Sequence, residues 1–574
     1  MIGNANAWAD EVQKQQPLPL GLCAIDVSED GRRIFVGGSL DDTISVIDAE
    51  TRSQNKVSFS GKGVAALKQL PEENCLLLAI TDPPSLLGIN LKEPSAPKPV
   101  QLPIPGRPSH IAISEIGVAC VTMTWQHSVA LASIDETGQL SPILPRIIAL
   151  SFPPGQVLAV SDDRFLIADA FGGKVALLDL NADPIVRERE LPIHHIGGLC
   201  SNASGTTVFL THQRLSSVAE TSRDDIHWGT LIQNNVSALS IEKFLDSNVP
   251  DNRQLQTRRL GNVGNGAADP AGILMNDDQD LFVAVSGTDQ LAILRKGAEQ
   301  PDFVDAGIRP TDVRRLGRDE IVVLNRLSRT LSIIRATRPW TLQATIGQPA
   351  PLETPEARGE RAFYSARLSH DQWMSCHSCH VDGHSPDLLA DTLGDGRHES
   401  PKRIPSLFGV SDTGPWSWTG SKMTLEDQIS QTLRTTMHGD DHRIEPLGSP
   451  DEITSDLVAY MATLSHPERL APTEAMTSNV EQGRAMFEQR GCIKCHAPDN
   501  HWTSKASWDI GVQDEQGHRE FNPPSLQSVI HRRAFFHDAR FRSLNEVLKS
   551  HHPGFDQSPT DTEAQLLIKY LTSN

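Results

Sequence analysis

Two short motifs in the C-terminal part of the 574-residue chain carry the residue types best suited to chemistry. Both have the pattern Cys-x-x-Cys-His, and they span Cys376–His380 and Cys492–His496. Two thiols three residues apart can add to the two vinyl groups of a haem, and the adjacent histidine then becomes an axial ligand of its iron. Two copies predict two covalently attached c-type haems. Their attachment residues are Cys376, Cys379, His380, Cys492, Cys495 and His496.

The segments that flank each motif show helical periodicity. Upstream of the first motif Gly359 and Phe363 are four residues apart, and upstream of the second motif Gly483 and Phe487 repeat this spacing. A glycine beside a phenylalanine on one helical face suits a helix that packs closely across another helix. Amphipathic segments follow the motifs at 456–464 and 565–571. The pattern predicts the crossed first and last helices of a small cytochrome c, twice.

An internal repeat joins the two motifs into duplicated lobes. Pro405-Ser-Leu recurs as Pro524-Ser-Leu, and Leu425-Glu-Asp recurs as Leu544-Asn-Glu. Both pairs are offset by 119 residues, as the numbering shows. Two separate electron carriers joined by a linker would not need this additional shared segment, so we predict two homologous lobes that each hold one haem.

The order of these motifs has a counterpart in a known family. The motifs are Ser375-Cys-His-Ser-Cys-His, Pro405-Ser-Leu, Trp418-Thr-Gly, Leu425-Glu-Asp-Gln, Gly483-x-x-x-Phe, Cys492-Ile-Lys-Cys-His, Pro524-Ser-Leu, Phe536-His-Asp and Leu544-Asn-Glu-Val. Over residues 355–574 the chain resembles the bacterial di-haem cytochrome c peroxidase/MauG family. In that family the N-terminal haem reacts with peroxide, and the C-terminal haem is low-spin and accepts or stores electrons. The resemblance implies an oxidoreductase with this division of roles.

The resemblance also implies three catalytic residues near the first haem. Trp418 matches a tryptophan that lies between the two haems, and Gln428 matches the distal glutamine of the family. Ten residues further on the family has a distal glutamate, where this sequence has His438. A neutral His438 could act as a general base toward peroxide, or it could bind the iron as sixth ligand. His384 and His398 compete with it as distal ligands.

The sixth ligand of the second haem is expected seven residues after Leu544, at His551. The family has methionine there in the peroxidases and tyrosine in MauG, and a second imidazole should lower the reduction potential relative to a thioether. His552 is the alternative, one residue later. The predicted iron ligands are His380, His496 and His551. The family also has a calcium site between its lobes, and here Pro523–Pro524 occupies the stretch that would supply part of it.

The N-terminal 350 residues read as short strands separated by turns, in a unit that recurs every 40–45 residues. Seven copies begin near residues 21, 64, 108, 159, 193, 272 and 310, and the fifth carries an insertion around 213–262. This is the period of a propeller blade, and the units resemble YVTN-type seven-bladed β-propellers. His194, His195, His212 and His227 lie in this region, and we expect no ligand role for these isolated histidines.

The expected fold class is therefore multidomain β plus α, a seven-bladed β-propeller followed by two α-helical cytochrome c-like lobes. Three prolines in 346–358 and the end of the strand pattern place a linker at about 345–357. The expected domains are an N-terminal extension at 1–16, the propeller at 17–350, a first, peroxidatic-type lobe at 351–470 and a second, electron-transfer lobe at 471–574.

Composition limits the partners. The chain has 52 basic and 72 acidic side chains, a formal net charge of −20, which argues against a nucleic-acid backbone as partner and fits a basic redox protein or plain solubility. No apolar run is long enough for a transmembrane helix. Cys23, Cys75, Cys120 and Cys200 lie in or beside apolar stretches, as buried thiols do.

Haem attachment to this motif takes place outside the cytoplasm, and the family is periplasmic. The chain begins without a charged segment followed by an apolar one, so we expect an exported protein whose signal peptide was removed or whose start was placed late. The leading hypothesis is a periplasmic di-haem c oxidoreductase that uses hydrogen peroxide and oxidises a small redox protein or a protein or peptide substrate docked by the propeller. The alternative is a non-enzymatic electron-transfer protein in which the propeller is the docking module.

Overall fold

The computed structural model describes residues 17–70, 74–91, 100–135, 139–181, 185–467, 474–550 and 558–573. The chain divides into two compact units. The first unit is the part up to Pro351, without two short segments, Leu215–Gln233 and Gly261–Gly266. These two segments belong to the second unit, together with Leu352–Asn574. No helix among the described residues has the length and apolar character that a bilayer crossing requires.

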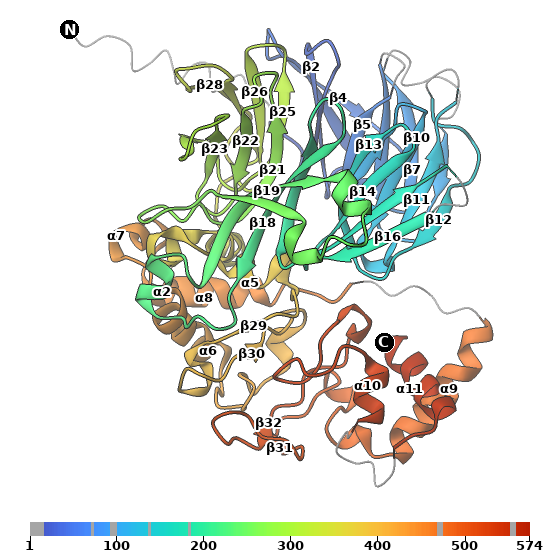
Figure 1. Ribbon diagram of the computed structural model, residues 1–574, viewed down its shortest axis with the longest axis vertical. Helices are drawn as coiled ribbons and strands as arrows, with labels where there is room; N and C mark the ends of the chain where they lie inside the picture. The colour runs from blue at the N-terminus through green and yellow to red at the C-terminus, as the bar shows by residue number, and fades with distance from the viewer. Residues whose placement is uncertain are drawn as a thin grey trace. The chain divides into compact units, whose positions relative to one another are not determined.

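Within its described residues the first unit consists of seven four-stranded antiparallel sheets, each with its strands in sequence order (Figure 1). This confirms the predicted seven-bladed β-propeller. The strands are β1 (Leu22–Val27), β2 (Arg33–Gly38), β3 (Thr43–Asp48), β4 (Gln54–Ser58), β5 (Lys62–Gln69), β6 (Cys75–Asp82), β7 (Pro84–Asn90), β8 (Gln101–Pro103), β9 (Ile111–Ile113), β10 (Val118–Met123), β11 (Ser128–Ser133), β12 (Arg146–Ala149), β13 (Pro154–Ser161), β14 (Arg164–Asp169), β15 (Lys174–Asp179), β16 (Ile185–Glu190), β17 (His194–Ser201), β18 (Thr207–Leu215), β19 (Ile232–Ser240), β20 (Leu255–Arg259), β21 (Pro270–Met275), β22 (Leu281–Val285), β23 (Gln290–Leu294), β24 (Asp302–Asp305), β25 (Pro310–Leu316), β26 (Glu320–Asn325), β27 (Thr330–Arg335) and β28 (Leu342–Ile346).

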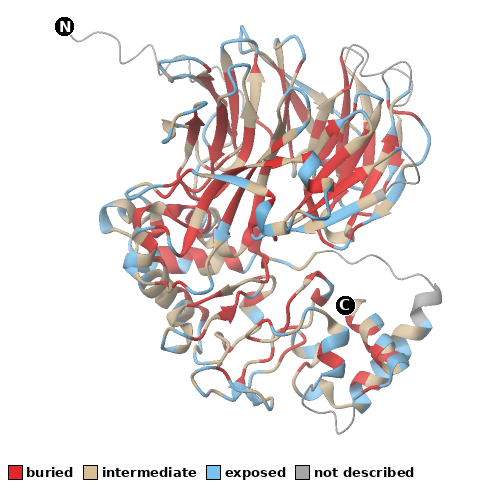
Figure 2. Ribbon diagram, viewed as in Figure 1, coloured by how far each residue is buried: buried red, intermediate tan, exposed pale blue. Residues whose placement is uncertain are grey.

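The inner strands of each sheet are mostly buried, whereas outer strands such as β4 and β12 are largely exposed (Figure 2). The inner strands are buried because apolar side chains of each sheet form clusters with those of the sheets before and after it. The ring closes where the first sheet meets the last. Leu22 and Ile34 of the first sheet share one apolar cluster with Val322 and Ile333 of the last. Two of the four cysteines of this unit are buried and two are partly buried, which fits the role of small apolar residues.

The second unit is mainly helical. Its helices are α2 (Arg223–His227), α4 (Pro355–Phe363), α5 (Cys376–Cys379), α6 (Leu425–Thr432), the π-helix η8 (Leu433–Met437), α7 (Asp441–Ile444), α8 (Pro450–Met461), α9 (Glu474–Gln489), α10 (Leu544–Lys549) and α11 (Asp561–Thr572), and its short strands are β29 (Leu389–Ala390), β30 (Lys402–Arg403), β31 (Trp508–Asp509) and β32 (Glu520–Phe521). The helical segments expected around each haem motif are all present. Helix α4 starts within the predicted linker, because Thr354 caps it and a proline occupies its first turn.

The two lobes repeat in their backbone as well as in their sequence. An isolated bridge joins Trp416 to Lys422, and a second one joins Phe535 to Phe541, at the same offset of 119 residues. The residues that follow Trp416 and Phe535 have nearly the same positive φ angle, 66° at Ser417 and 68° at Phe536. The duplication predicted from two sequence phrases thus extends to a distinctive turn. The division between the lobes at residues 470 and 471 stays a prediction.

Two glycines let the first and last helix of each lobe cross closely. A Cβ atom on Gly359 of α4 would collide with the Asp456 carbonyl of α8 and lie 2.8 Å from the Tyr460 Cβ. A Cβ atom on Gly483 of α9 would collide with the Leu566 carbonyl of α11 and lie 2.7 Å from the Tyr570 Cβ. In each lobe the phenylalanine four residues later packs on that tyrosine, with ring centroids 5.2 Å and 5.4 Å apart.

We expect Gly483→Ala to lower the free energy of unfolding of the second unit by about 1–3 kcal/mol, because the helices must separate to admit a methyl group. An unobstructed Gly→Ala change inside a helix would instead raise it by about 0.5–1 kcal/mol. Urea unfolding followed by circular dichroism measures the difference. Gln482→Ala is the control, because Gln482 is exposed on the same helix and should change stability little. A stabilising Gly483→Ala would contradict the close crossing.

The segment Leu215–Gln233 connects strands β18 and β19 of the fifth sheet, and the segment Gly261–Gly266 follows its last strand, β20. Both segments pack against Trp373 in the second unit. Trp373 is fully buried, three residues before the first haem motif. A Cβ atom on Gly261 would lie 2.8 Å from its ring, one on Gly229 would collide with the ring, and one on Gly266 would collide with the Trp373 backbone. Only residues without a side chain allow this approach, so the insertion is shaped to the tryptophan.

Candidate functional site

The first attachment motif lines a cavity of the second unit. Cys376, Cys379 and His380 form part of its mainly apolar wall, and it encloses about 1930 Å³ of empty space, including the solvent at its mouth. Helix α5 carries both cysteines, and a capping box between Ser375 and Ser378 fixes its first turn. The motif therefore lies on an ordered helical turn that faces the cavity.

The second motif lines another mainly apolar cavity of the same unit. Cys492, Cys495 and His496 contribute to it, and it encloses about 1060 Å³, again including solvent at its mouth. Several residues separate the two cavities and belong to both walls. Among the described residues these are Arg403, Trp418, Asn522, Pro523, Pro524 and Arg532.

Both motif histidines are oriented as iron ligands need to be. The Nδ1 atom of His380 lies 2.9 Å from the Pro405 carbonyl, and the Nδ1 atom of His496 lies 3.2 Å from the Trp502 carbonyl. A carbonyl accepts, so each Nδ1 carries the proton and each Nε2 keeps its lone pair for a metal. Burial lowers the pKa of His380 to about 4, against the opposing effect of the Pro405 hydrogen bond, so this ring is neutral at pH 7.

Two guanidinium groups, of the buried Arg403 and the half-buried Arg532, belong to the walls of both cavities. Arg403 forms an ion pair with Asp387 at 3.0 Å, and Arg532 donates a hydrogen bond to the Ser525 carbonyl. Burial lowers the pKa of Arg532 to about 9, so it is still a cation at pH 7. Such cations can bind the carboxylates of a haem. Paired cysteines at the cavity walls, oriented imidazoles, apolar walls and adjacent cations together fit two covalently bound haems.

The side chain of Gln428 lines the first cavity from helix α6. Its Oε1 atom is buried and has no hydrogen-bond partner among the described residues. Its Nε2 atom makes a long hydrogen bond of 3.4 Å to the Thr432 hydroxyl. A buried acceptor without a donor is costly, unless a bound molecule supplies the donor.

His438 lies elsewhere. It does not belong to the described lining of the first cavity, and its Nε2 lies 3.0 Å from the Thr221 carbonyl. The reason is the π-helical turn η8, which follows α6 and ends at His438 in a left-handed conformation, with φ 51°. This turn brings Met437 to the cavity wall in its place. The distal role predicted for His438 would require the ring to leave Thr221.

The other two distal candidates are also held away from this cavity. The His384 ring nitrogens lie 3.1 Å from the Ser406 hydroxyl and 3.4 Å from the His531 carbonyl, and burial lowers its pKa to about 3. The Nδ1 atom of His398 lies 3.9 Å from an Asp391 oxygen. Neither histidine belongs to the described lining.

Trp418 forms part of the partition between the cavities. Its Nε1 donates to the Arg403 carbonyl at 2.8 Å, and the Arg403 guanidinium lies 5.2 Å from the ring centroid. Its neighbour in the second lobe is His537, at 6.4 Å between ring centroids, which is also its counterpart at the offset of 119 residues. Trp416, in contrast, lines the first cavity and not the second.

The predicted second-haem ligand His551 and its alternative His552 lie outside the described residues, so this ligand stays a prediction. The calcium site also stays a prediction.

Some residues of the site were missed by the sequence analysis, namely Arg403, Arg532, Asp395 and Lys402, which line the first cavity. Charged residues are common in this sequence and these four belong to no motif, so only the fold shows that they lie at the cavity.

Comparison with known proteins agrees with the geometry. A family model described as di-haem cytochrome c peroxidase matches residues 355–476 and 478–573. The methylamine utilization protein MauG of Methylorubrum extorquens is 24% identical over 254 residues, which cover 36% of this chain and 71% of that protein. The cytochrome c551 peroxidase of Pseudomonas aeruginosa is 24% identical over 180 residues, or 26% of this chain and 52% of that protein. The cytochrome c551 peroxidase of Nitrosomonas europaea is 20% identical over 252 residues, or 35% and 75%.

Proposed function

With a C-terminal region of the di-haem cytochrome c peroxidase/MauG type, the protein is a di-haem c oxidoreductase, and we propose that it uses hydrogen peroxide as its oxidant. Hydrogen peroxide takes up two electrons and two protons and leaves as two water molecules. The two electrons come from a small redox protein or from a protein or peptide side chain. The region carries two covalently bound haem c groups, whose iron supplies the redox chemistry with peroxide when bound.

The observation that carries this proposal is the buried, unpartnered Oε1 of Gln428 at the first cavity. Hydrogen peroxide has two O–H donors, and one of them can satisfy this oxygen. A side-chain amide is neither protonated nor deprotonated at neutral pH, so Gln428 would orient peroxide rather than act as a base. The hydrogen bond favours peroxide over a molecule without a donor, such as dioxygen.

Trp418 is the side chain proposed to pass electrons between the cavities. It belongs to both walls, and indole is among the side chains that lose an electron most readily. The Arg403 guanidinium over its ring favours the neutral indole and therefore raises its potential. A residue of high potential suits transfer toward a strong oxidant such as peroxide.

The docking role of the propeller and the periplasmic location are further parts of this proposal. A propeller offers a broad rigid surface to a macromolecular substrate, and a chain of net charge −20 attracts a basic redox protein. The family is periplasmic, which agrees with two haems attached through thiols. A large docking module favours a protein or peptide substrate over a small molecule.

The test is electron paramagnetic resonance of the ferric holoprotein with and without peroxide. We expect a high-spin signal that disappears when peroxide is added. In Gln428→Leu the reaction rate with peroxide should fall by about 100-fold or more, since a loss of about 2.7 kcal/mol in transition-state binding suffices. Gln431→Leu is the matched control, because Gln431 lines the same cavity but donates to the Leu393 carbonyl at 2.7 Å.

Two low-spin haems whose spectra peroxide leaves unchanged would overturn the proposal and would favour the electron-transfer alternative. An equal loss of rate in the two glutamine variants would contradict the specific role of Gln428. A rate that falls in Gln428→Leu alone supports it.

A further inference from the structure

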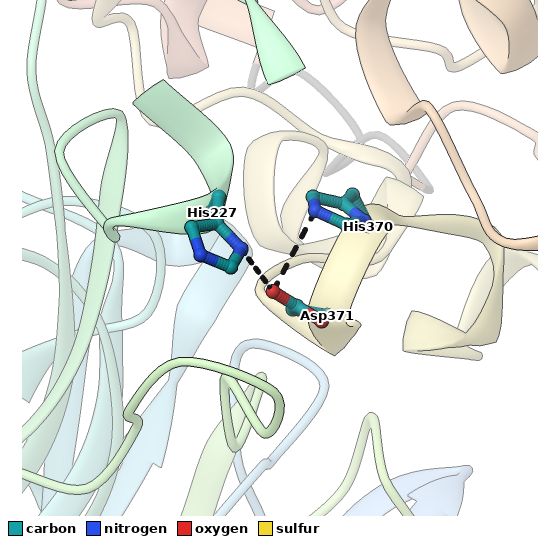
Figure 3. A group of neighbouring side chains, drawn as sticks. All are labelled: His227, His370 and Asp371. Atoms are coloured by element: carbon teal, nitrogen blue, oxygen red, sulfur yellow. Dashed lines mark hydrogen bonds and ion pairs between the residues drawn. The ribbon is translucent and has the colours of Figure 1, made fainter. Parts of the chain in front are cut away.

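Three side chains that no haem motif contains meet in the second unit. They are His227 at the end of α2, and His370 and Asp371 in the turn before the first attachment motif (Figure 3). The Nδ1 atom of His227 lies 2.7 Å from Asp371 Oδ2, and the Nε2 atom of His370 lies 3.6 Å from the same oxygen. One ligand atom from each residue lies within 4.8 Å of the others. The edges of a tetrahedral zinc shell are roughly 3.3 Å, so metal binding would widen the distance between His227 and Asp371 and shorten the longer distances by up to about 1.5 Å.

His370 is oriented by a second carboxylate. Its Nδ1 lies 3.1 Å and 3.2 Å from the two oxygens of Asp440. Asp440 is in turn held by Arg223, whose guanidinium lies 2.8 Å away. The Asp440 carboxylate accepts the Nδ1 proton, so Nε2 keeps a lone pair that points to Asp371. A carboxylate behind a ligating histidine is the usual outer shell of a metal site, because it fixes the tautomer and makes the ring more basic.

Hydrogen bonds hold the backbone at both His227 and Asp371. Asp371 has the left-handed φ of 52°, which costs energy in a residue other than glycine and persists only where surrounding contacts impose it. Here the Gly266 amide donates to the Asp371 carbonyl at 2.7 Å. On the other side the Trp373 Nε1 donates to the His227 carbonyl at 3.3 Å. The three ligands therefore start close to one arrangement, which reduces the cost of binding.

We propose that His227, His370 and Asp371 bind one divalent transition-metal ion of the zinc class. Two imidazoles and one carboxylate suit zinc, whereas calcium and magnesium prefer shells of oxygen. The His370 and Asp371 side chains are about 10% exposed, and that of His227 is 33% exposed, which leaves an entry path and a fourth position for water. None of these residues belongs to the haem attachment motifs, so the site is independent of the haems and of the proposed use of peroxide.

The ion would fasten the insertion Leu215–Gln233 to the turn that precedes Cys376. The sequence assigned no ligand role to His227, and its partners lie more than 140 positions away in the chain. In the absence of metal the Nδ1 of His227 donates a hydrogen bond to Asp371, and metal binding would replace this Nδ1 proton. The site thus makes the position of the insertion depend on metal.

The test uses the full-length holoprotein without an affinity tag. The haems are covalent, so treatment with a chelator removes labile zinc and leaves the iron in place. After zinc is added back, we expect metal analysis by mass spectrometry to find one zinc ion per chain. Isothermal titration should give a dissociation constant of about 1 µM or below, which is modest for three such ligands. X-ray absorption at the zinc edge should show nitrogen and oxygen ligands at about 2.0–2.1 Å, with no sulfur.

The variants separate ligand loss from misfolding. His227→Ala and Asp371→Asn should weaken zinc binding by about 100-fold or more, and Asp440→Asn by about 10-fold to 100-fold. Asparagine tolerates the left-handed conformation, so Asp371→Asn keeps the turn. His442→Ala is the control, because His442 is exposed on the neighbouring helix α7 and should bind zinc like the unaltered protein. Zinc content below about a tenth of an equivalent, or equal affinity in His227→Ala and the unaltered protein, would overturn the proposal.

Discussion

Replacing Trp418 with phenylalanine is expected to separate the two haem sites functionally while each site keeps its own haem. Phenylalanine fills most of the same space in the partition, but it is far harder to oxidise and lacks the N–H that donates to the Arg403 carbonyl. We expect the peroxide-dependent turnover of an electron donor to fall by about 100-fold or more, the effect of a barrier raised by about 2.7 kcal/mol. The reaction with peroxide at the first site should keep its rate.

Stopped-flow absorbance distinguishes these effects, because it follows both haems after a single addition of peroxide. The first haem should respond as before and the second should respond slowly. Trp416→Phe is the matched control, since Trp416 lines the first cavity alone and donates to the Val410 carbonyl at 2.9 Å. Equal turnover in Trp418→Phe and Trp416→Phe would contradict a special role of the shared tryptophan.

Much of the haem region could be predicted because its chemistry is local in sequence. Cysteine spacing and the adjacent histidine define attachment within five residues, and the structure adds the orientation of His380 and His496 through carbonyls. The helix crossings were predictable from Gly359 and Gly483, because a glycine four residues before a phenylalanine signals a close approach. The propeller could be predicted because the sequence repeats the pattern of one four-stranded unit seven times.

The distal side of the first haem was harder to predict because it depends on the phase of a helix. His438 is ten residues after Gln428. If α6 continued as a regular α-helix, the side-chain direction at each later position would follow from a constant rotation per residue. The π-turn η8 inserts a wider turn, so Met437 meets the cavity and His438 meets Thr221 instead. A π-turn leaves no reliable mark in a single sequence.

Contacts between distant segments were beyond the sequence analysis. An insertion around 213–262 was visible as extra length in the fifth repeat, but its packing around Trp373 was not. The two glycines against the Trp373 indole, the third against its backbone, and His227 beside His370 all depend on where the chain returns in space. No periodicity encodes such a return, so these features required the structure.

Lys402 offers a second prediction with a large expected effect, on stability rather than on activity. Its ammonium group is buried in the second unit, 3.3 Å from Asp514, 3.6 Å from Asp395 and 3.9 Å from Glu515. It also donates to the Ser400 carbonyl at 2.9 Å. Asp395 precedes it in the first lobe, and Asp514 and Glu515 follow the second motif. One cation thus compensates carboxylates from both lobes.

We expect Lys402→Met to lower the free energy of unfolding by about 3–5 kcal/mol, because removing one partner leaves buried carboxylates uncompensated. Chemical denaturation at pH 7 measures the change. Lys549→Met is the control, since Lys549 and its partner Asp561 are both exposed and such pairs contribute less than about 1 kcal/mol. Adding Asp514→Asn to Lys402→Met should restore part of the lost stability, whereas two additive losses would contradict a direct pairing.

The pH dependence of this effect follows from Asp514. Burial alone would raise its pKa, but hydrogen bonds from His518 and the charge of Lys402 lower it from 3.8 to about 2. A carboxyl group with a lowered pKa stabilises the fold above its unfolded pKa, and this contribution is lost as the pH falls toward its folded pKa. The stability difference between the unaltered protein and Lys402→Met should therefore be full at pH 7 and shrink as the pH falls from 3.8 through about 2. A difference that stays constant over that range would mean that Lys402 stabilises the lobes through packing of its aliphatic stem rather than through charge.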